Sequence, residues 1–167
     1  MAKLIKNRAL ANDEWVLVQE IADPQTLLQD CEQALILPLP FWLEHRDALC
    51  QRQARKAVWL DSHELPEALG EDLHGFELIA LRFPVFSDGR AYSSARELRQ
   101  NLAYKGELRA VGDVLRDQLF YMARCGFDSF ALREDQNPEH ALTAFDDFRD
   151  AYQSSVDCPD PLFRRRA

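Results

Sequence analysis

The sequence has no apolar run near the roughly 18 residues that a membrane-spanning helix requires, and its first residues lack the apolar core of a secretion signal. It also lacks any Cys-x-x-Cys pair, because Cys31, Cys50, Cys125 and Cys158 are widely spaced. This spacing excludes a zinc ribbon, a thioredoxin-type centre and an iron–sulfur cluster. We therefore expect a soluble cytoplasmic protein with reduced thiols, no membrane span and no bound metal.

Lysine is scarce, since the chain has four lysines and sixteen arginines against 28 acidic residues, with a formal charge of -8. A general binder of nucleic acid or of anionic membranes needs a basic face, so this balance argues against both roles. Arginine is suited to bidentate binding of carboxylate, phosphate and other oxyanions, which leaves a local basic pocket open. The alternative is that these arginines are ordinary solvated surface residues.

Several nucleotide and nucleophile motifs are missing. The chain contains no P-loop, no Gly-x-Gly-x-x-Gly and no serine nucleophile elbow, and its four histidines do not have the spacing of metal ligands. A nicotinamide or nucleoside-triphosphate enzyme of standard type is therefore disfavoured, and we expect no cofactor. The residues alone do not identify a reaction, so whether the protein is an enzyme stays open.

The order of apolar segments predicts an α/β fold. A chain of 167 residues is long enough to bury a substantial core without disulfides. Five apolar runs alternate with amphipathic segments, and the connections are too long for hairpins, which predicts parallel β-α-β units in an open sheet or a partial barrel. The five predicted strands are residues 34–39, 57–61, 76–83, 107–111 and 127–132.

The two ends of the chain depart from this alternation. Residues 3–5 and 15–18 are short β-prone runs, and they predict an N-terminal β-hairpin with its turn near Asn12 and Asp13. We expect a single α/β domain over residues 1–153. Residues 154–167 contain two prolines and three terminal arginines, which predicts a flexible tail, or alternatively a docking segment.

Polar residues follow the predicted strands at the edge where parallel sheets commonly place their chemistry. Helix amino-termini also point toward that edge and favour an anion. The alternative is ordinary turn and cap chemistry, in which Ser94 begins one helix through a capping box and Asp113 caps the next. The anion-binding candidates of this edge are Asp88, Arg90, Ser93, Ser94, Asp113 and Arg116, and the secondary candidates are Asp61, Ser62 and His63.

Arg82 and Arg109 are unusual because both occur inside β-type apolar runs. A charge is costly to bury there unless it meets a partner or a ligand. If both side chains point to one face near the strand ends, they could form an oxyanion clamp with Arg90 or Arg116. The alternative is that they pair with internal carboxylates such as Glu77, Glu107 or Asp113.

Cys125 is predicted near the carboxyl end of a helix, just before Gly126, which is placed to end that helix. The negative end of a helix dipole raises the pKa of a thiol, which is the wrong direction for a nucleophile. We therefore interpret Cys125 as a packing residue.

Three segments of the chain resemble a bacterial family of unknown function. They are residues 86–96 (Phe-Ser-Asp-Gly-Arg-Ala-Tyr-Ser-Ser-Ala-Arg), 106–119 (Gly-Glu-Leu-Arg-Ala-Val-Gly-Asp-Val-Leu-Arg-Asp-Gln-Leu) and 124–128 (Arg-Cys-Gly-Phe-Asp). The resemblance extends over residues 34–151. Genes of that family typically lie beside those for sirohaem sulfite reductase, and its members are labelled oxidoreductases of sulfite reduction.

The resemblance implies an accessory protein of assimilatory sulfate and sulfite reduction, with sulfite reductase or another sulfur-assimilation enzyme as its partner. It implies no particular catalytic residue. Two alternatives stay open at this point. One is a small oxyanion- or phosphate-binding enzyme that uses the strand ends, and the other is a non-catalytic structural subunit.

Overall fold

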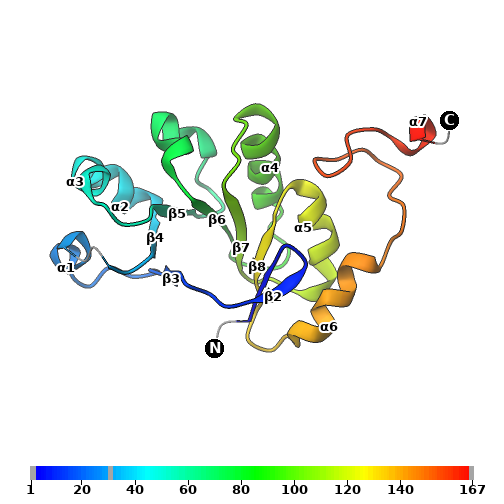
Figure 1. Ribbon diagram of the computed structural model, residues 1–167, viewed down its shortest axis with the longest axis horizontal. Coiled ribbons are helices and arrows are strands. Elements are labelled where there is room, and N and C mark those ends of the chain that lie inside the picture. The colour runs from blue at the N-terminus through cyan, green and yellow to red at the C-terminus, as the bar shows by residue number, and fades with distance from the viewer. Residues whose placement is uncertain (1–2, 30–31, 166–167) are drawn as a thin grey trace.

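The sheet is open and strongly curled, forming a half-barrel in this computed structural model, which describes residues 3–29 and 32–165 (Figure 1). Its eight described strands follow the order β2-β1-β8-β7-β6-β5-β4-β3. Strands β3 to β8 pair in parallel, whereas β1 is antiparallel to both β2 and β8. The strands are β1 (Leu4–Lys6), β2 (Ala9–Ala11), β3 (Val16–Leu17), β4 (Leu35–Pro38), β5 (Ala57–Leu60), β6 (Leu78–Phe83), β7 (Glu107–Gly112) and β8 (Ser129–Ala131).

The predicted α/β class and the five central strands are confirmed, and the sheet is the curled form of the two that the sequence allowed. Helices pack on its outer side, where α2 contacts β4 and β5, and α4 contacts β6 (Figure 1). The helical segments are α1 (Pro24–Gln29), α2 (Leu39–Glu44), α3 (Arg46–Gln51), η1 (Pro66–Gly75), α4 (Arg90–Arg96), η2 (Glu97–Asn101), η3 (Arg116–Gln118), α5 (Leu119–Cys125), α6 (Pro138–Leu142), η4 (Thr143–Asp146) and α7 (Leu162–Arg165).

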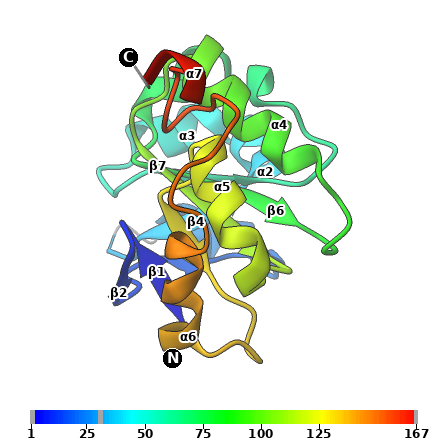
Figure 2. The same cartoon turned by 90° about the vertical axis from the view of Figure 1, so that its right-hand side faces the viewer.

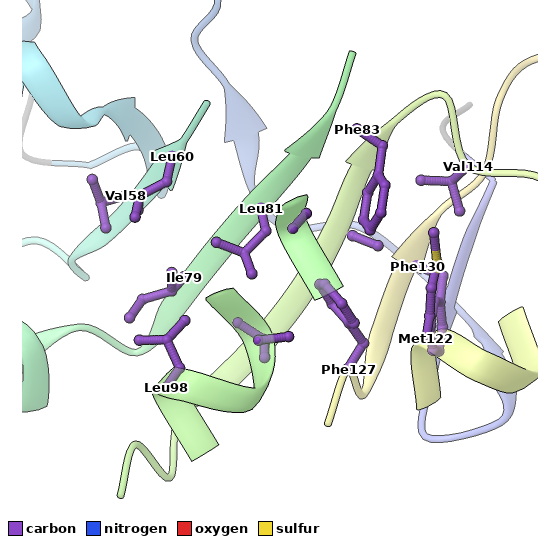
Figure 3. Packing of buried hydrophobic residues seen from close by; sticks show 14 of the residues in the cluster. Val58, Leu60, Ile79, Leu81, Phe83, Leu98, Val114, Met122, Phe127 and Phe130 are labelled. Atoms are coloured by element: carbon purple, nitrogen blue, oxygen red, sulfur yellow. The ribbon is translucent and has the colours of Figure 1, made fainter. Parts of the chain in front are cut away.

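The central strands bury apolar side chains on both faces, which explains their continuous apolar runs. On the outer face Val58, Ile79 and Phe83 pack against helix residues such as Leu98 and Met122 (Figure 3). The inner face carries a smaller cluster formed by Trp15, Ile36, Ala57, Leu78, Ala80 and Val111. Successive residues of a strand point to opposite faces, so each run supplies both clusters.

The N-terminal hairpin is confirmed, but its second strand and its turn are not the predicted ones. β1 pairs with β2, and the turn between them is formed by Asn7 and Arg8, both with positive φ (50° and 62°). The run at residues 15–18 instead supplies β3, which pairs in parallel with β4 at the opposite edge of the sheet. The chain between β2 and β3 therefore crosses from one edge to the other beneath the curved sheet (Figure 1).

Two predicted helix starts are wrong. Helix α4 begins at Arg90 with Gly89 as its N-cap, so Ser94 lies inside the helix rather than at its start. Asp113 caps no helix, because the next helical turn begins at Arg116 and the Gln118 side chain accepts from the Leu115 amide. By contrast, Gly126 ends α5 in the left-handed conformation, as predicted.

The C-terminal part of the chain is helical over a shorter stretch than its apolar spacing indicates. Asn137 caps α6 through a hydrogen bond from the His140 amide, as expected for Asn-Pro. The helical turns end at Asp146, and the apolar residues beyond them, Phe148 and Tyr152, are exposed.

The segment after residue 153 contacts helix α5 (Figure 2). The Ser155 hydroxyl and the Val156 amide both donate to the Arg124 carbonyl, at 2.7 and 3.1 Å. The domain boundary at residue 153 and the flexible tail stay predictions, and these contacts fasten the first residues of that segment to the core.

Candidate functional site

The polar residues selected from the sequence gather where β5, β6 and β7 end. Asp61 and Ser62 follow β5, Asp88 and Arg90 follow β6, and Asp113 follows β7. Because these strands are parallel neighbours, their carboxyl ends form one rim of the half-barrel. We call this set the strand-end rim.

A continuous chain of hydrogen bonds joins the first two strand ends. Arg82 Nη1 donates to Asp61 Oδ2 at 3.0 Å, and Asp61 Oδ1 accepts from the Ser62 amide at 2.7 Å. The Ser62 hydroxyl in turn accepts from Arg90 Nη2 at 2.8 Å. Arg90 also forms a bidentate pair with Asp88, at 3.0 and 2.6 Å, and these hydrogen bonds hold the pKa of Asp88 well below its usual range. Both arginines of this hydrogen-bonded series, Arg82 and Arg90, therefore already have a carboxylate partner.

The third strand end forms a separate group. The Asp113 carboxylate accepts from the Phe86 amide at 2.7 Å and from Arg133 Nη1 at 2.6 Å. Arg116 forms a bidentate pair with Asp147, at 3.0 and 2.7 Å. Arg133, which the sequence interpretation omitted, follows β8 as Asp61 follows β5, so the strand-end rule that selected Asp61 would have found it.

Three of the predicted residues take no part in these groups. Ser93 and Ser94 lie within α4, where the Ser94 hydroxyl donates at 3.5 Å to the Arg90 carbonyl of its own helix. His63 is exposed beside Asp61. Within the described part of the chain, none of the three contacts the paired arginines of the rim beyond that helical bond, so the rim is built by carboxylates, arginines and the Ser62 hydroxyl.

Arg109 faces the inner side of the sheet and is buried, with 2% of its side chain exposed. It forms ion pairs with Asp13 at 2.8 Å and with Glu107 at 2.8 Å, and its Nε donates to the Ser129 hydroxyl at 3.1 Å. Glu107 is the internal partner that the sequence suggested, whereas Asp13 was not anticipated. Arg109 is thus satisfied internally, and the oxyanion clamp with Arg82 stays a prediction that requires Arg109 to leave these partners.

Burial alone would raise the pKa of Glu107, but hydrogen bonds from Lys6 and Arg109 outweigh it and leave the pKa below its usual value. The cluster of Arg109, Asp13 and Glu107 therefore holds charged groups inside the half-barrel. Its role in the fold is to fix the crossing segment of the N-terminal chain against β7.

A cavity of about 190 Å³ opens on the inner face beside the strand-end rim. Its lining includes Gln19, Trp59 and Arg82. The Trp59 indole donates to the Val18 carbonyl at 2.9 Å, and the Arg82 guanidinium lies 5.8 Å from the Trp59 ring centroid. Only Nη1 of Arg82 donates within the described chain, and 45% of its side chain is exposed. The remaining N–H groups of Arg82 are the positive contacts that this cavity offers to a small anion, and the acidic residue Glu20 also lines it.

An apolar loop projects beside this rim. Val85 and Phe86 are 54% and 63% exposed, yet the backbone of Phe86 is held at both its polar groups. Its amide donates to Asp113, and its carbonyl accepts from Gln118 Nε2 at 3.3 Å. The loop therefore presents a large apolar side chain from a fixed backbone.

Cys125 is fully buried, and this burial raises the pKa of its thiol. Its interpretation as a packing residue agrees with this position, while Cys31 lies outside the described residues. Within residues 3–29 and 32–165, no three His, Cys, Asp or Glu side chains are grouped as metal ligands. A search of the same residues for a helix long and apolar enough to cross a membrane finds none.

The comparison with protein families identifies a match over residues 57–163, which is more than half of the chain. The matching family model is described as a bacterial protein of unknown function (DUF934). It covers β5 to β8 together with the strand-end rim. No curated protein matches the chain.

Proposed function

The chain belongs to this bacterial family of unknown function, and we propose that it is an accessory protein of assimilatory sulfate and sulfite reduction. In this proposal it acts in the cytoplasm and docks on sulfite reductase or another enzyme of sulfur assimilation. Both the sequence resemblance described above and the chemistry of the strand-end rim support this role.

The observation that carries the proposal is the fixed, exposed loop at Val85 and Phe86. Large apolar side chains that remain exposed on a rigid backbone are common anchors of protein interfaces, because binding them costs little ordering entropy. The neighbouring Arg90 is already paired with Asp88, so it is not poised as a free cation for catalysis or anion binding. This combination favours docking over chemistry at the rim.

The charge of the protein supports a particular kind of partner. With a formal charge of -8, the chain would be steered toward a basic surface on the partner enzyme. Docking would then bury Phe86 within a ring of polar rim residues, the arrangement typical of interface anchors.

Binding to purified sulfite reductase, measured by biolayer interferometry, tests the proposal. Phe86→Ser should weaken binding by at least tenfold, because truncating an interface anchor typically costs 2 kcal/mol or more. Leu65→Ser is the matched control, since Leu65 is 65% exposed in the loop after β5. Equal binding by wild type and Phe86→Ser, or equal losses from both variants, would argue against this docking surface.

Growth of a deletion strain tests the pathway itself. We expect the strain to grow normally on cysteine but poorly on sulfate as sole sulfur source, with rescue by the wild-type gene and not by Phe86→Ser. Normal growth of the deletion strain on sulfate would contradict the assignment.

A second candidate is a small oxyanion-binding enzyme or carrier, and Arg82 is the observation that favours it. Its guanidinium is the rim cation with the most limited internal pairing, and it lines the cavity beside Trp59. Calorimetric titration with sulfite and with nucleotide sulfates should then show saturable heat that Arg82→Ala abolishes. No measurable heat at millimolar ligand would reject this candidate. If the protein also failed to bind sulfite reductase, the non-catalytic structural subunit would be the remaining alternative.

A further inference from the structure

A groove of about 420 Å³ lies between the β1–β2 turn, η4 and the C-terminal segment. None of its lining residues belongs to the strand-end rim. Four arginines line it with two aspartates, an excess of positive charge in a protein whose formal charge is -8. The arginines are Arg8, Arg124, Arg149 and Arg165.

These arginines are poorly paired, in contrast to those of the rim. Within the described part of the chain, no ion pair or side-chain hydrogen bond involves Arg8 or Arg149. Arg165 donates only to the Ala151 carbonyl, at 3.1 Å. Arg124 is the exception, because it is buried, its Nη2 donates to the Gln153 carbonyl, and it forms an ion pair with Asp157, whose carboxylate lies 3.5 Å from an Nε that makes no hydrogen bond. The guanidinium groups of Arg8 and Arg149 are therefore the ones available to a ligand oxygen.

The position of Arg8 carries a backbone cost. Arg8 adopts φ of +62° in a two-residue hairpin turn, where glycine is the favoured second residue. A residue with a Cβ in this conformation costs about 1 kcal/mol or more, and such strain is often found at ligand sites. The turn places the Arg8 guanidinium 5.7 Å from the Phe145 ring centroid, at the groove.

Aromatic rings supply the apolar part of the groove. Phe120 and Phe148 lie with ring centroids 5.1 Å apart, and both line it together with Phe145. Phe148 is 63% exposed, so much of its side chain is accessible to a ligand. Guanidinium groups bind phosphate oxygens, and phenyl rings stack on planar heterocycles.

We propose that this groove binds a small organic anion that combines a phosphate group with a planar ring, a ligand of the nucleoside monophosphate class. Arg8, Arg149 and Arg165 bind the phosphate, and the ring packs on Phe148. The site is independent of the docking function proposed above, because it shares no residue with the strand-end rim.

Isothermal titration with three probes tests the site: adenosine 5′-monophosphate, inorganic phosphate and adenosine. We expect the nucleotide to bind at least tenfold more tightly than either fragment, because only it engages both the arginines and the ring. Arg149→Ala should lower nucleotide affinity about tenfold, the usual loss for a hydrogen bond to a charged group. Phe148→Ser should weaken nucleotide binding while leaving inorganic phosphate unchanged.

Arg164→Ala is the control, since Arg164 neighbours Arg165 but does not line the groove. Arg149 is exposed and makes no described side-chain bond, so its removal should leave the circular dichroism spectrum and melting temperature unchanged. No saturable heat with millimolar nucleotide would overturn the proposal. So would equal affinity for inorganic phosphate and nucleotide, or equal losses from Arg149→Ala and Arg164→Ala.

Discussion

Arg109 donates two hydrogen bonds to the carboxylate of Asp13, at 2.8 and 2.9 Å, across a sequence separation of 96 residues. This ion pair ties the segment that crosses the inner face of the half-barrel to the centre of the sheet. Because Arg109 is almost fully buried, breaking this pair should cost more folding stability than breaking a surface ion pair of the same length.

Adjacent residues allow that difference to be measured. Asp13→Asn should lower the free energy of unfolding by about 2–3 kcal/mol, toward the low end for a broken buried pair because Glu107 remains beside Arg109. Glu14→Gln removes an exposed pair with Arg55 and should cost less than about 1 kcal/mol. Urea denaturation of both variants gives the comparison, and similar losses would contradict the central role of the buried pair.

Glu107 predicts a specific acid sensitivity. Because its pKa is lower in the folded protein than in the unfolded chain, Glu107 stabilises the fold at neutral pH. That contribution is lost as the pH falls below the unfolded-chain value of about 4.3. The difference in unfolding free energy between wild type and Glu107→Gln should therefore shrink from pH 6 toward acid, and denaturation curves that keep it constant would count against this mechanism.

Gly112 ends β7 in a conformation that excludes a side chain. Its φ is +94°, and a Cβ there would lie 2.4 Å from the Phe83 carbonyl oxygen. Gly112→Ala should destabilise the protein by about 2 kcal/mol or more, through strain and the clash with a backbone atom. Gly75→Ala is the control, since a Cβ at Gly75 meets nothing within 4 Å. If both variants had melting temperatures near that of the wild type, the backbone at the end of β7 would have to shift at little cost to accept a Cβ, which would contradict this prediction.

Cysteine labelling reports on burial at α5. The raised pKa and full burial of Cys125 predict slow alkylation at pH 8, whereas the exposed Cys50 should react quickly. Mass spectrometry of iodoacetamide-treated protein separates the peptides, and urea should bring the Cys125 rate to that of Cys50. Fast native labelling of Cys125 would mean that α5 opens readily.

The central strands were predictable because both faces of each are buried. Ile79 and Leu81 serve the outer core while Leu78 and Ala80 serve the inner cluster, so β6 forms an apolar run that sequence identifies easily. The strand that pairs with the run at residues 15–18 could not be predicted in the same way. Alternation marks Val16 as a strand residue, but it carries no information on whether the neighbouring strand is β1 or β4.

The strand-end residues illustrate the same limit at the site. Asp113 was placed at the rim correctly by its position after β7, but its carboxylate bonds to the Phe86 amide and Arg133 instead of capping a helix. Local rules identify a residue with capping potential, whereas its final partner depends on which loops the fold brings near it. Asp13 was missed as a partner of Arg109 for this reason, because only the crossing of the sheet brings them together.

The N-terminal strands and the crossing segment complete parts of the sheet that lie far along the chain. β1 pairs with β8, which lies more than a hundred residues later in the sequence. A fragment limited to the matched family region, residues 57–163, would leave β8 with an open edge and Arg109 without Asp13. β1 therefore supplies the strand that covers the edge of β8. A protein trimmed to residues 57–163 would also keep the buried Arg109 without the Asp13 carboxylate that balances part of its charge.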